Sequence, residues 1–226
     1  MQVEQILNHL NELADPRAVT IWSRMYASPE PYLGVNLTRL KGLAKEIKRN
    51  HPLALALWAT AVHDAKLLAT MIEDPKKVTE EQIDQQMMQV HTADLCDKYC
   101  SNVVAKTPLL LPKIKQWAEH SGEMYKRGGY MLIYTLARSD TLTEDEFFAP
   151  YLAAIQAEIA GERNWVREAM NYALIAIGGR TAQLNQAATA VARQIGPIEV
   201  DYGDTSCKAP DALASLAKHQ RLEQIA

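Results

Sequence analysis

Apolar residues recur every three to four positions along almost the whole chain, the pattern of helices that each bury one face. Val3, Ile6, Leu7, Leu10 and Leu13 form the first such stripe. Prolines stand mainly between stripes, and a helix tolerates proline in its first turn but not in its interior. The pattern predicts helices over residues 3–14, 17–27, 36–50, 52–72, 79–89, 91–105, 109–120, 122–139, 143–159, 163–177, 180–195 and 210–222. We expect an all-α protein, since the nearest run to a strand, residues 198–202, is too short for a sheet.

Two local signals bear on these helices. Thr143 is followed three residues later by Glu146, a capping-box signature that predicts a helix start at Thr143. Gly128 and Gly129 are consecutive within the helix predicted over 122–139, where each glycine costs about 1 kcal/mol. Close packing of another helix and close approach of a ligand both explain the two glycines, and the sequence leaves both open.

An internal repeat indicates how the helices are organised. Residues 125–132 and 165–172 align at an offset of 40, with an aromatic residue, an arginine and a small residue in register. A period near 40 is typical of HEAT-like helical hairpins, which stack into a curved solenoid with a concave surface. We predict a single HEAT-like repeat domain over residues 1–226, with an ordinary helical bundle as the alternative. Residues 196–210 predict a loop before a short C-terminal helix that caps the array.

Composition limits the function. The chain has 24 Lys and Arg against 27 Asp and Glu, a net charge of −3, which excludes a globally basic nucleic-acid binder. A DNA-binding role therefore needs a local basic face. Three cysteines in a chain of this size predict reduced thiols and a cytoplasmic protein, and no apolar run is long enough to span a membrane. No glycine-rich phosphate loop, dinucleotide fingerprint or nucleophile elbow is present, so we expect no cofactor.

The cysteines do not predict a metal or a nucleophile. His91, Cys96 and Cys100 miss the usual zinc-ligand spacings, so we expect no metal, with both cysteines in the core. Cys207 lies beside Lys208, which favours a reactive thiolate, but Asp204 opposes it and no histidine is near. We therefore predict that the segment around Cys207 is a structural loop.

A run of cations lies on the helix predicted over 36–50. Arg39, Lys41, Lys45, Lys48 and Arg49 are opposed only by Glu46. Such a run either follows the phosphates of a nucleic acid or is a solvated helix face, and the pattern alone leaves both open.

Three stretches together resemble the bacterial DNA alkylation repair family, the AlkD-like HEAT-repeat DNA glycosylases. Residues 32–35 (YLGV) with 39–45 resemble the family's N-terminal YxGV segment and the helix after it. Residues 94–97 (DLCD) resemble its W-D-x-x-D motif, and residues 123–130 and 164–178 resemble two later helix starts. The resemblance covers most of the chain and implies a HEAT-like fold.

The resemblance implies excision of cationic 3- or 7-alkylpurines from duplex DNA. Asp97 would stabilise the oxocarbenium-like sugar and Arg127 would hold a phosphate, while Tyr172 replaces a tryptophan of the family's site. The aromatic residue that opens the family motif is Ala93 here, and a later arginine is Ile175. The expected further DNA contacts are Lys126, Arg39, Lys41 and Lys45.

Two functions follow from these residues. The first is an alkylpurine DNA glycosylase that uses Asp97. The second is a non-catalytic HEAT-repeat module that binds damaged or branched DNA or a protein partner, which Ala93, Ile175 and the net charge of −3 favour.

Overall fold

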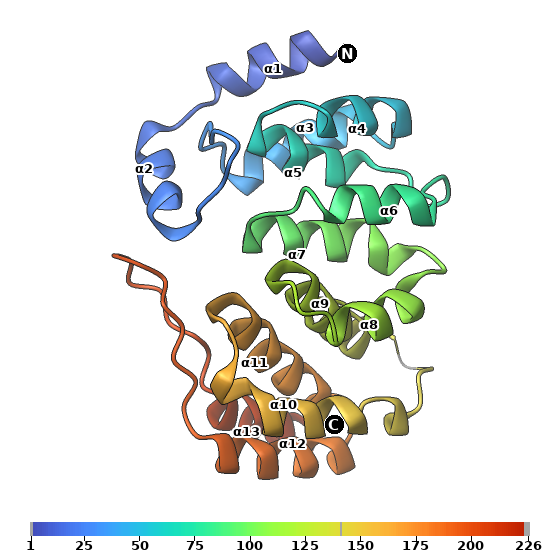
Figure 1. Ribbon diagram of the computed structural model, residues 1–226, viewed down its shortest axis with the longest axis vertical. Coiled ribbons are helices and arrows are strands. Elements are labelled where there is room, and N and C mark those ends of the chain that lie inside the picture. Colours follow the sequence, from blue (N-terminus) through green and yellow to red (C-terminus); the bar gives the residue numbers. More distant parts are fainter. Residues whose placement is uncertain (1, 141, 224–226) are drawn as a thin grey trace. The chain divides into compact units, whose positions relative to one another are not determined.

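The structure is a computed structural model that describes residues 2–140 and 142–223 (Figure 1). These residues form 13 α-helices and no strand, which confirms the prediction of an all-α, HEAT-like fold. They divide into two compact units. Unit 1 holds residues 2–110 and 203–205, and unit 2 holds the other described residues from 111 onward, so that α8 (Leu110–Ala118) belongs to unit 2 except for its first residue.

Unit 1 is built around one central helix, α5, whose residues are almost all buried. Helix α5 packs against its hairpin partner α4 and also contacts α3 and α7. The fully buried side chains include Ile6, Leu40, Leu57 and Leu68, which come from α1, α3, α4 and α5. The helices of unit 1 are α1 (Val3–Glu12), α2 (Pro16–Met25), α3 (Leu37–Ile47), α4 (His51–Trp58), α5 (His63–Ile72), α6 (Glu80–Met87) and α7 (Ala93–Asn102), with the 3₁₀ helix η1 (Val104–Lys106).

The prediction of one helix over residues 52–72 is wrong, because the chain turns back between α4 and α5. At the start of α5 the His63 N–H donates to the carbonyl of Pro31 at 3.2 Å. At the other end of the hairpin the Asn50 N–H donates to the carbonyl of Ile72 at 2.8 Å. Both bonds join residues that are far apart in the sequence. Residues 59–62 contain no glycine or proline, so the local sequence does not reveal this turn.

Unit 2 is centred on the long pair α9 and α11. Helix α12 packs against α10, α11 and α13, and α13 also contacts α11. Trp117, Tyr130 and Phe148 are the largest aromatic side chains that are almost fully buried here. The helices of unit 2 are α8 (Leu110–Ala118), α9 (Glu123–Ser139), α10 (Ala149–Glu158), α11 (Asn164–Gly178), α12 (Ala182–Ile195) and α13 (Ala212–Glu223), with 3₁₀ helices η2 (Asp145–Phe147) and η3 (Ile159–Gly161).

The predicted start of a helix at Thr143 is also wrong, since α10 begins at Ala149. The Thr143 hydroxyl donates back to the Asp140 carboxylate instead of capping a helix. Its carbonyl accepts a hydrogen bond from Arg180 at 2.7 Å, which ties this segment to the region after α11. Side-chain partners therefore keep Thr143 out of an α-helix, and the 3₁₀ helix η2 (Asp145–Phe147) precedes α10.

Equivalent helices of the repeat are visible in the spacing of their starts. Helices α5, α7, α9 and α11 begin at His63, Ala93, Glu123 and Asn164, so successive starts lie 30, 30 and 41 residues apart. The predicted period near 40 thus describes α9 and α11. The earlier repeats are shorter, with hydrogen bonds between positions 31 or 32 residues apart, such as Trp58 to Gln89 and Asn102 to Thr70.

The segment between α12 and α13 contains no helix, but side chains of unit 2 hold its first part. The side chain of Asn164 makes two hydrogen bonds to the backbone of Asp201, at 2.8 and 2.7 Å. Tyr202 is buried, and its hydroxyl donates to Glu168 Oε1 at 2.6 Å. Cys207, farther along, is exposed.

Helix packing explains Gly129. A Cβ atom at this position would lie 2.7 Å from the Cα of Ala118 in α8, and closer still to the Ala118 nitrogen. Real Cβ atoms do not approach backbone this closely. Close packing of α8 against α9, one of the two explanations that the sequence left open, therefore accounts for this glycine.

We expect Gly129→Ala to destabilise the protein by about 3 kcal/mol, at the upper end of overpacking costs, because the new methyl group meets backbone rather than a flexible side chain. The measurement is urea unfolding followed by circular dichroism. Gly42→Ala is the control, because nothing lies within 4 Å of a Cβ there and alanine favours a helix. Equal stability of the Gly129→Ala variant and the unchanged protein would contradict this account.

Candidate nucleic-acid interface

Three lysines surround one open hollow of about 450 Å³ in unit 1. Lys41, Ala44 and Lys45 of α3 form one side, and Met71 of α5 lies between the two sides. Lys98 and Asn102 of α7 form the other side. We call this feature the basic hollow.

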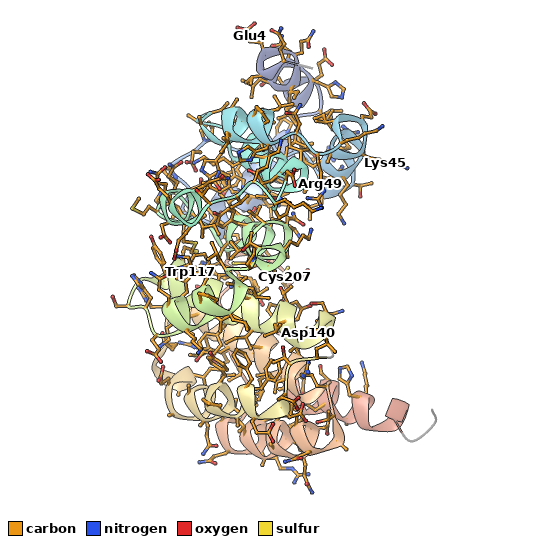
Figure 2. All side chains as sticks on the ribbon, turned by 90° about the vertical axis from the view of Figure 1, so that its right-hand side faces the viewer. Glu4, Lys45, Arg49, Trp117, Asp140 and Cys207 are labelled. Carbon is orange, nitrogen blue, oxygen red and sulfur yellow. The ribbon has the colours of Figure 1, made fainter. Side chains whose placement is uncertain are left out.

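The lysines of the basic hollow carry charge that no carboxylate of the described residues neutralises. Lys41 and Lys45 are exposed and Lys98 is half-buried. Among the residues that the structure describes, no carboxylate lies within ion-pair distance of these three amines. Lys66 and Lys126, in contrast, both pair with carboxylates. Figure 2 shows the Lys45 side chain projecting outward from unit 1. Unpaired amines on two helices that border one hollow suit a ligand with several anionic groups, such as a phosphate backbone.

Other cations of the predicted run lie close by on the same unit. Arg39 is exposed on α3, and its backbone N–H donates to the capping side chain of Asn36 at 3.0 Å. The Arg49 guanidinium donates to the carbonyl of Glu73 at 3.1 Å. Partial burial and the charge of Arg49 lower the pKa of Lys106 below its usual value. Arg49 and Lys106 are therefore close enough for each charge to repel the other, and together they add to the positive potential of unit 1.

Lys48 ends α3 in a strained backbone conformation. Its φ is +62°, and it is the one non-glycine residue among those described with a positive φ. Such a conformation costs about 1–3 kcal/mol for a residue with a side chain, and glycine adopts it readily. A lysine in place of the favoured glycine keeps one more cation beside Arg49.

We expect Lys48→Gly to stabilise the protein by about 1 kcal/mol, because glycine relieves the strain at φ +62°. Thermal unfolding checks this, with Lys76→Gly as the control at an exposed position whose φ is not positive. A lower melting temperature for Lys48→Gly than for the unchanged protein would contradict the strain argument.

Helix α7 is anchored at its first turn by a buried histidine of α5. His63 Nε2 and Asp94 Oδ2 are 2.8 Å apart, and the His63 ring is fully buried against Tyr32, with ring centroids 4.5 Å apart. Burial opposes ionisation of Asp94, but its hydrogen bond to His63 and the charge of that ring outweigh it and lower the pKa of Asp94. This contact fixes the turn of α7 that precedes Asp97.

The segment Tyr32–Val35 is held by a single buried carboxylate. Asp64 accepts hydrogen bonds from the N–H groups of Leu33 and Val35, both at 2.7 Å. Gly34 has a φ of +81°, and a Cβ there would run into the carbonyl oxygen of Asp15. The glycine is therefore required by the fold of unit 1.

Asp97 lies half-buried on α7, directly before Lys98 of the basic hollow. One turn earlier on α7, the position of the family's aromatic residue is occupied by Ala93, which is 1% exposed. Cys96 and Cys100 are fully buried, which confirms that they are core residues. Among the described residues no three His, Cys, Asp or Glu side chains are grouped to hold a metal ion.

Arg127 is engaged in a buried network of unit 2. Its NH1 donates to Glu168 Oε2 at 2.8 Å and to the carbonyl of Trp165 at 2.7 Å. The guanidinium also lies 5.8 Å from the centroid of the Trp165 ring. Arg127 and Glu168 are 1% and 5% exposed, so this pair joins α9 to α11 inside unit 2.

The other predicted residues of unit 2 are also partnered. Lys126 contacts Glu158 at 2.7 Å and also contacts Glu162. Partial burial favours the neutral amine, but these two carboxylates outweigh it and raise the pKa of Lys126. The half-buried ring of Tyr172 lies 6.0 Å from that of Tyr134. The structure thus brings Lys41 and Lys45 together in unit 1, and it places Lys126, Arg127 and Tyr172 in unit 2.

Sequence reasoning missed Lys98 as part of the basic surface. Lys98 stands 53 residues after Lys45 and outside the run of cations on α3. Only the packing of α3 and α7 on either side of α5 brings the three lysines to one hollow. The local sequence of α7 contains no signal for this arrangement.

Comparisons with known proteins agree with the fold and the motifs. The family model described as DNA alkylation repair enzyme matches residues 6–214. An uncharacterised protein of Listeria innocua is 28% identical over 220 residues, covering 95% of this chain and 96% of the relative. An uncharacterised protein of Listeria monocytogenes is 26% identical over 224 residues with the same two shares.

A solved structure shares the fold, with a TM-score of 0.86 at 22% identity, covering 99% of this chain and 95% of its own. It is described as representing a new family of proteins related to the HEAT-like repeat DNA glycosylases with affinity for branched DNA structures. No helix among the described residues is long and apolar enough to cross a membrane. Since the family model covers nearly all of the sequence, the chain belongs to the DNA alkylation repair enzyme family.

Proposed function

We propose that this protein binds DNA through the basic hollow of unit 1 and prefers branched or damaged DNA to plain duplex. The observation that carries the proposal is the group of three lysines on α3 and α7, for which the described residues supply no carboxylate partner. Each of them is free to neutralise a phosphate and release its counterion. The net charge of −3 is compatible with this role, because the cations are gathered locally.

The relatives support the preference for unusual DNA structures. The structure with a TM-score of 0.86 belongs to proteins described by their affinity for branched DNA. Lysine contacts to phosphates position a protein on DNA but do not read its sequence. The discrimination we propose is therefore one of DNA shape. We further propose that the protein acts in the cytoplasm, where its three thiols stay reduced.

The test is a fluorescence anisotropy titration with a plain duplex, an abasic duplex and a four-way junction of equal length. We expect binding that weakens steeply with salt and is tighter for the junction or the abasic duplex. Equal affinity for all three would contradict the preference. No binding to any of them at 50 mM salt would contradict DNA binding itself and would favour a protein partner.

A second candidate function is excision of cationic 3- or 7-alkylpurines, and it rests on Asp97. This half-buried carboxylate lies on α7 beside a lysine that we assign to phosphate. In this reaction the C1′–N bond breaks, and the purine leaves with the bonding electron pair and loses its positive charge. Water then adds to C1′ and releases a proton. A carboxylate near the sugar would stabilise the intermediate oxocarbenium charge.

Release of methylated purines from alkylated duplex DNA distinguishes the two candidates. If the protein is a glycosylase, Asp97→Asn should lower the rate at least a hundredfold, the scale of losing one electrostatic stabiliser, and leave DNA affinity unchanged. Asp204→Asn, at an exposed loop position, is the control. Absence of release by the unchanged protein would exclude this second function and leave the binding proposal standing.

A further inference from the structure

Unit 2 contains a small hollow whose lining combines an aromatic ring with two basic side chains. Its volume is about 290 Å³, and it lies among α9, α11 and α13. No carboxylate is among its lining residues, although the chain has 27 Asp and Glu. We call it the tyrosine hollow, and it is lined by Tyr134, Ala137, Arg138, Ile175, Ala176, Gly179 and His219.

The aromatic wall of the tyrosine hollow is held in place by neighbours. Tyr134 is half-buried, and its ring centroid lies 6.0 Å from that of Tyr172. The hydroxyl of Tyr172 donates to Glu168 Oε1 at 3.5 Å, and Glu168 is itself fixed by Arg127. The Tyr134 ring is thus a supported surface against which a flat group can stack.

Arg138 supplies a cation over the Tyr134 ring. The Arg138 guanidinium lies 5.1 Å from the centroid of the Tyr134 ring and donates to the Tyr134 hydroxyl. Within the described residues, no carboxylate reaches ion-pair distance of Arg138, which is exposed. This leaves guanidinium N–H groups to bind a phosphate.

The imidazole of His219 also lines the hollow. It lies against Gly179, where a Cβ atom would be only 3.1 Å from His219 Cε1. The absence of a side chain at Gly179 thus makes room for the ring. The imidazole therefore faces the same hollow as Tyr134 and Arg138.

We propose that the tyrosine hollow binds one unpaired nucleotide of DNA, with the base against Tyr134 and a phosphate on Arg138 and His219. The proposal deepens the DNA-binding function and rests on it. A base inside a duplex has both faces covered by neighbouring bases, so only an unpaired base can stack on a tyrosine. The volume lies at the lower limit of ligand pockets, which suits one nucleotide and excludes a duplex. Branch points, gaps and strand ends are the DNA structures that offer such a nucleotide.

The experiment compares Tyr134→Leu and Arg138→Gln with the unchanged protein, using a gapped duplex, an intact duplex and a short oligothymidylate as probes. Leucine keeps an apolar side chain but removes the ring. We expect Tyr134→Leu to weaken binding to the gapped duplex and to oligothymidylate by about 5- to 100-fold, the range for losing one base stack. Binding to the intact duplex should stay unchanged. Arg193→Gln, an exposed arginine of α12 outside the hollow, is the control for Arg138→Gln.

The outcomes separate this proposal from the proposed function. If both variants bind all three probes like the unchanged protein, the tyrosine hollow is not a nucleotide site, although DNA binding stands. The same conclusion follows if they weaken the intact and gapped duplexes equally. If the unchanged protein binds none of the probes at 50 mM salt, DNA binding itself fails and the nucleotide site fails with it. Arg138 is exposed, so its variant tests the site even if Tyr134→Leu unfolds.

Discussion

Replacing Lys41, Lys45 and Lys98 together by glutamine is expected to lower DNA affinity about a hundredfold at 0.15 M salt. The dependence of log K on log salt has a slope of about −0.9 per neutralised phosphate, so each contact contributes about fivefold at that salt concentration. Three lost contacts multiply to about a hundredfold. The measurement is the anisotropy titration with the four-way junction and with the plain duplex, and both affinities should fall by a similar factor.

A matched triple variant controls for the loss of net charge. Lys76, Lys77 and Lys115 are all exposed and lie outside the basic hollow. Their replacement by glutamine removes the same three charges and should change affinity by less than about threefold. If both triple variants lose affinity equally, DNA responds to overall charge, and the basic hollow is not the binding surface.

Replacing Arg127 by methionine is expected to destabilise the protein by about 3–5 kcal/mol, since breaking a buried ion pair leaves one charge uncompensated. Glu168, which would be left, is only 5% exposed. In a chain of this size the loss corresponds to a fall in melting temperature of roughly 10 °C. Thermal unfolding followed by circular dichroism measures it.

A second substitution separates loss of the pair from loss of side-chain packing. In a double variant that combines Arg127→Met with Glu168→Gln, the new amide side chain is uncharged. Its carbonyl still accepts the hydrogen bond that Tyr202 now donates to Glu168. We therefore expect the double variant to be more stable than Arg127→Met alone. Arg193→Met, at an exposed position, should leave the melting temperature unchanged. A double variant less stable than the single variant would contradict a role for the buried pair.

The fold was predictable where it depends on local pattern. The helical period and the prolines predict most helices to within a few residues, and the match between residues 125–132 and 165–172 predicts the relation of α9 to α11. The two errors have different causes. At the start of α5 the His63 N–H donates to the carbonyl of Pro31, a contact between residues far apart in the sequence, whereas Thr143 donates its hydroxyl to Asp140, only three residues before it. That residues 1–226 act as a single domain stays a prediction.

The candidate site was predictable only in part. The cations of α3 are visible in the sequence, but their grouping with Lys98 depends on the packing of three helices. Arg127 matches a family motif, yet the sequence does not show that Glu168, 41 residues later, is its partner. Asp97 and its role as a catalytic carboxylate likewise stay a prediction, because a motif specifies a residue type and not the chemistry at that position.

The most direct test of DNA binding through the basic hollow is the salt dependence of affinity for the four-way junction. Affinities of the unchanged protein and of the Lys41, Lys45 and Lys98 triple variant are compared between 50 and 300 mM salt. We predict that the slope of log K against log salt becomes shallower by about 2.7 in the triple variant, which is three phosphate contacts at about 0.9 each. The Lys76, Lys77 and Lys115 variant should keep the slope of the unchanged protein. Identical slopes for all three proteins would contradict the assignment of the basic hollow to DNA.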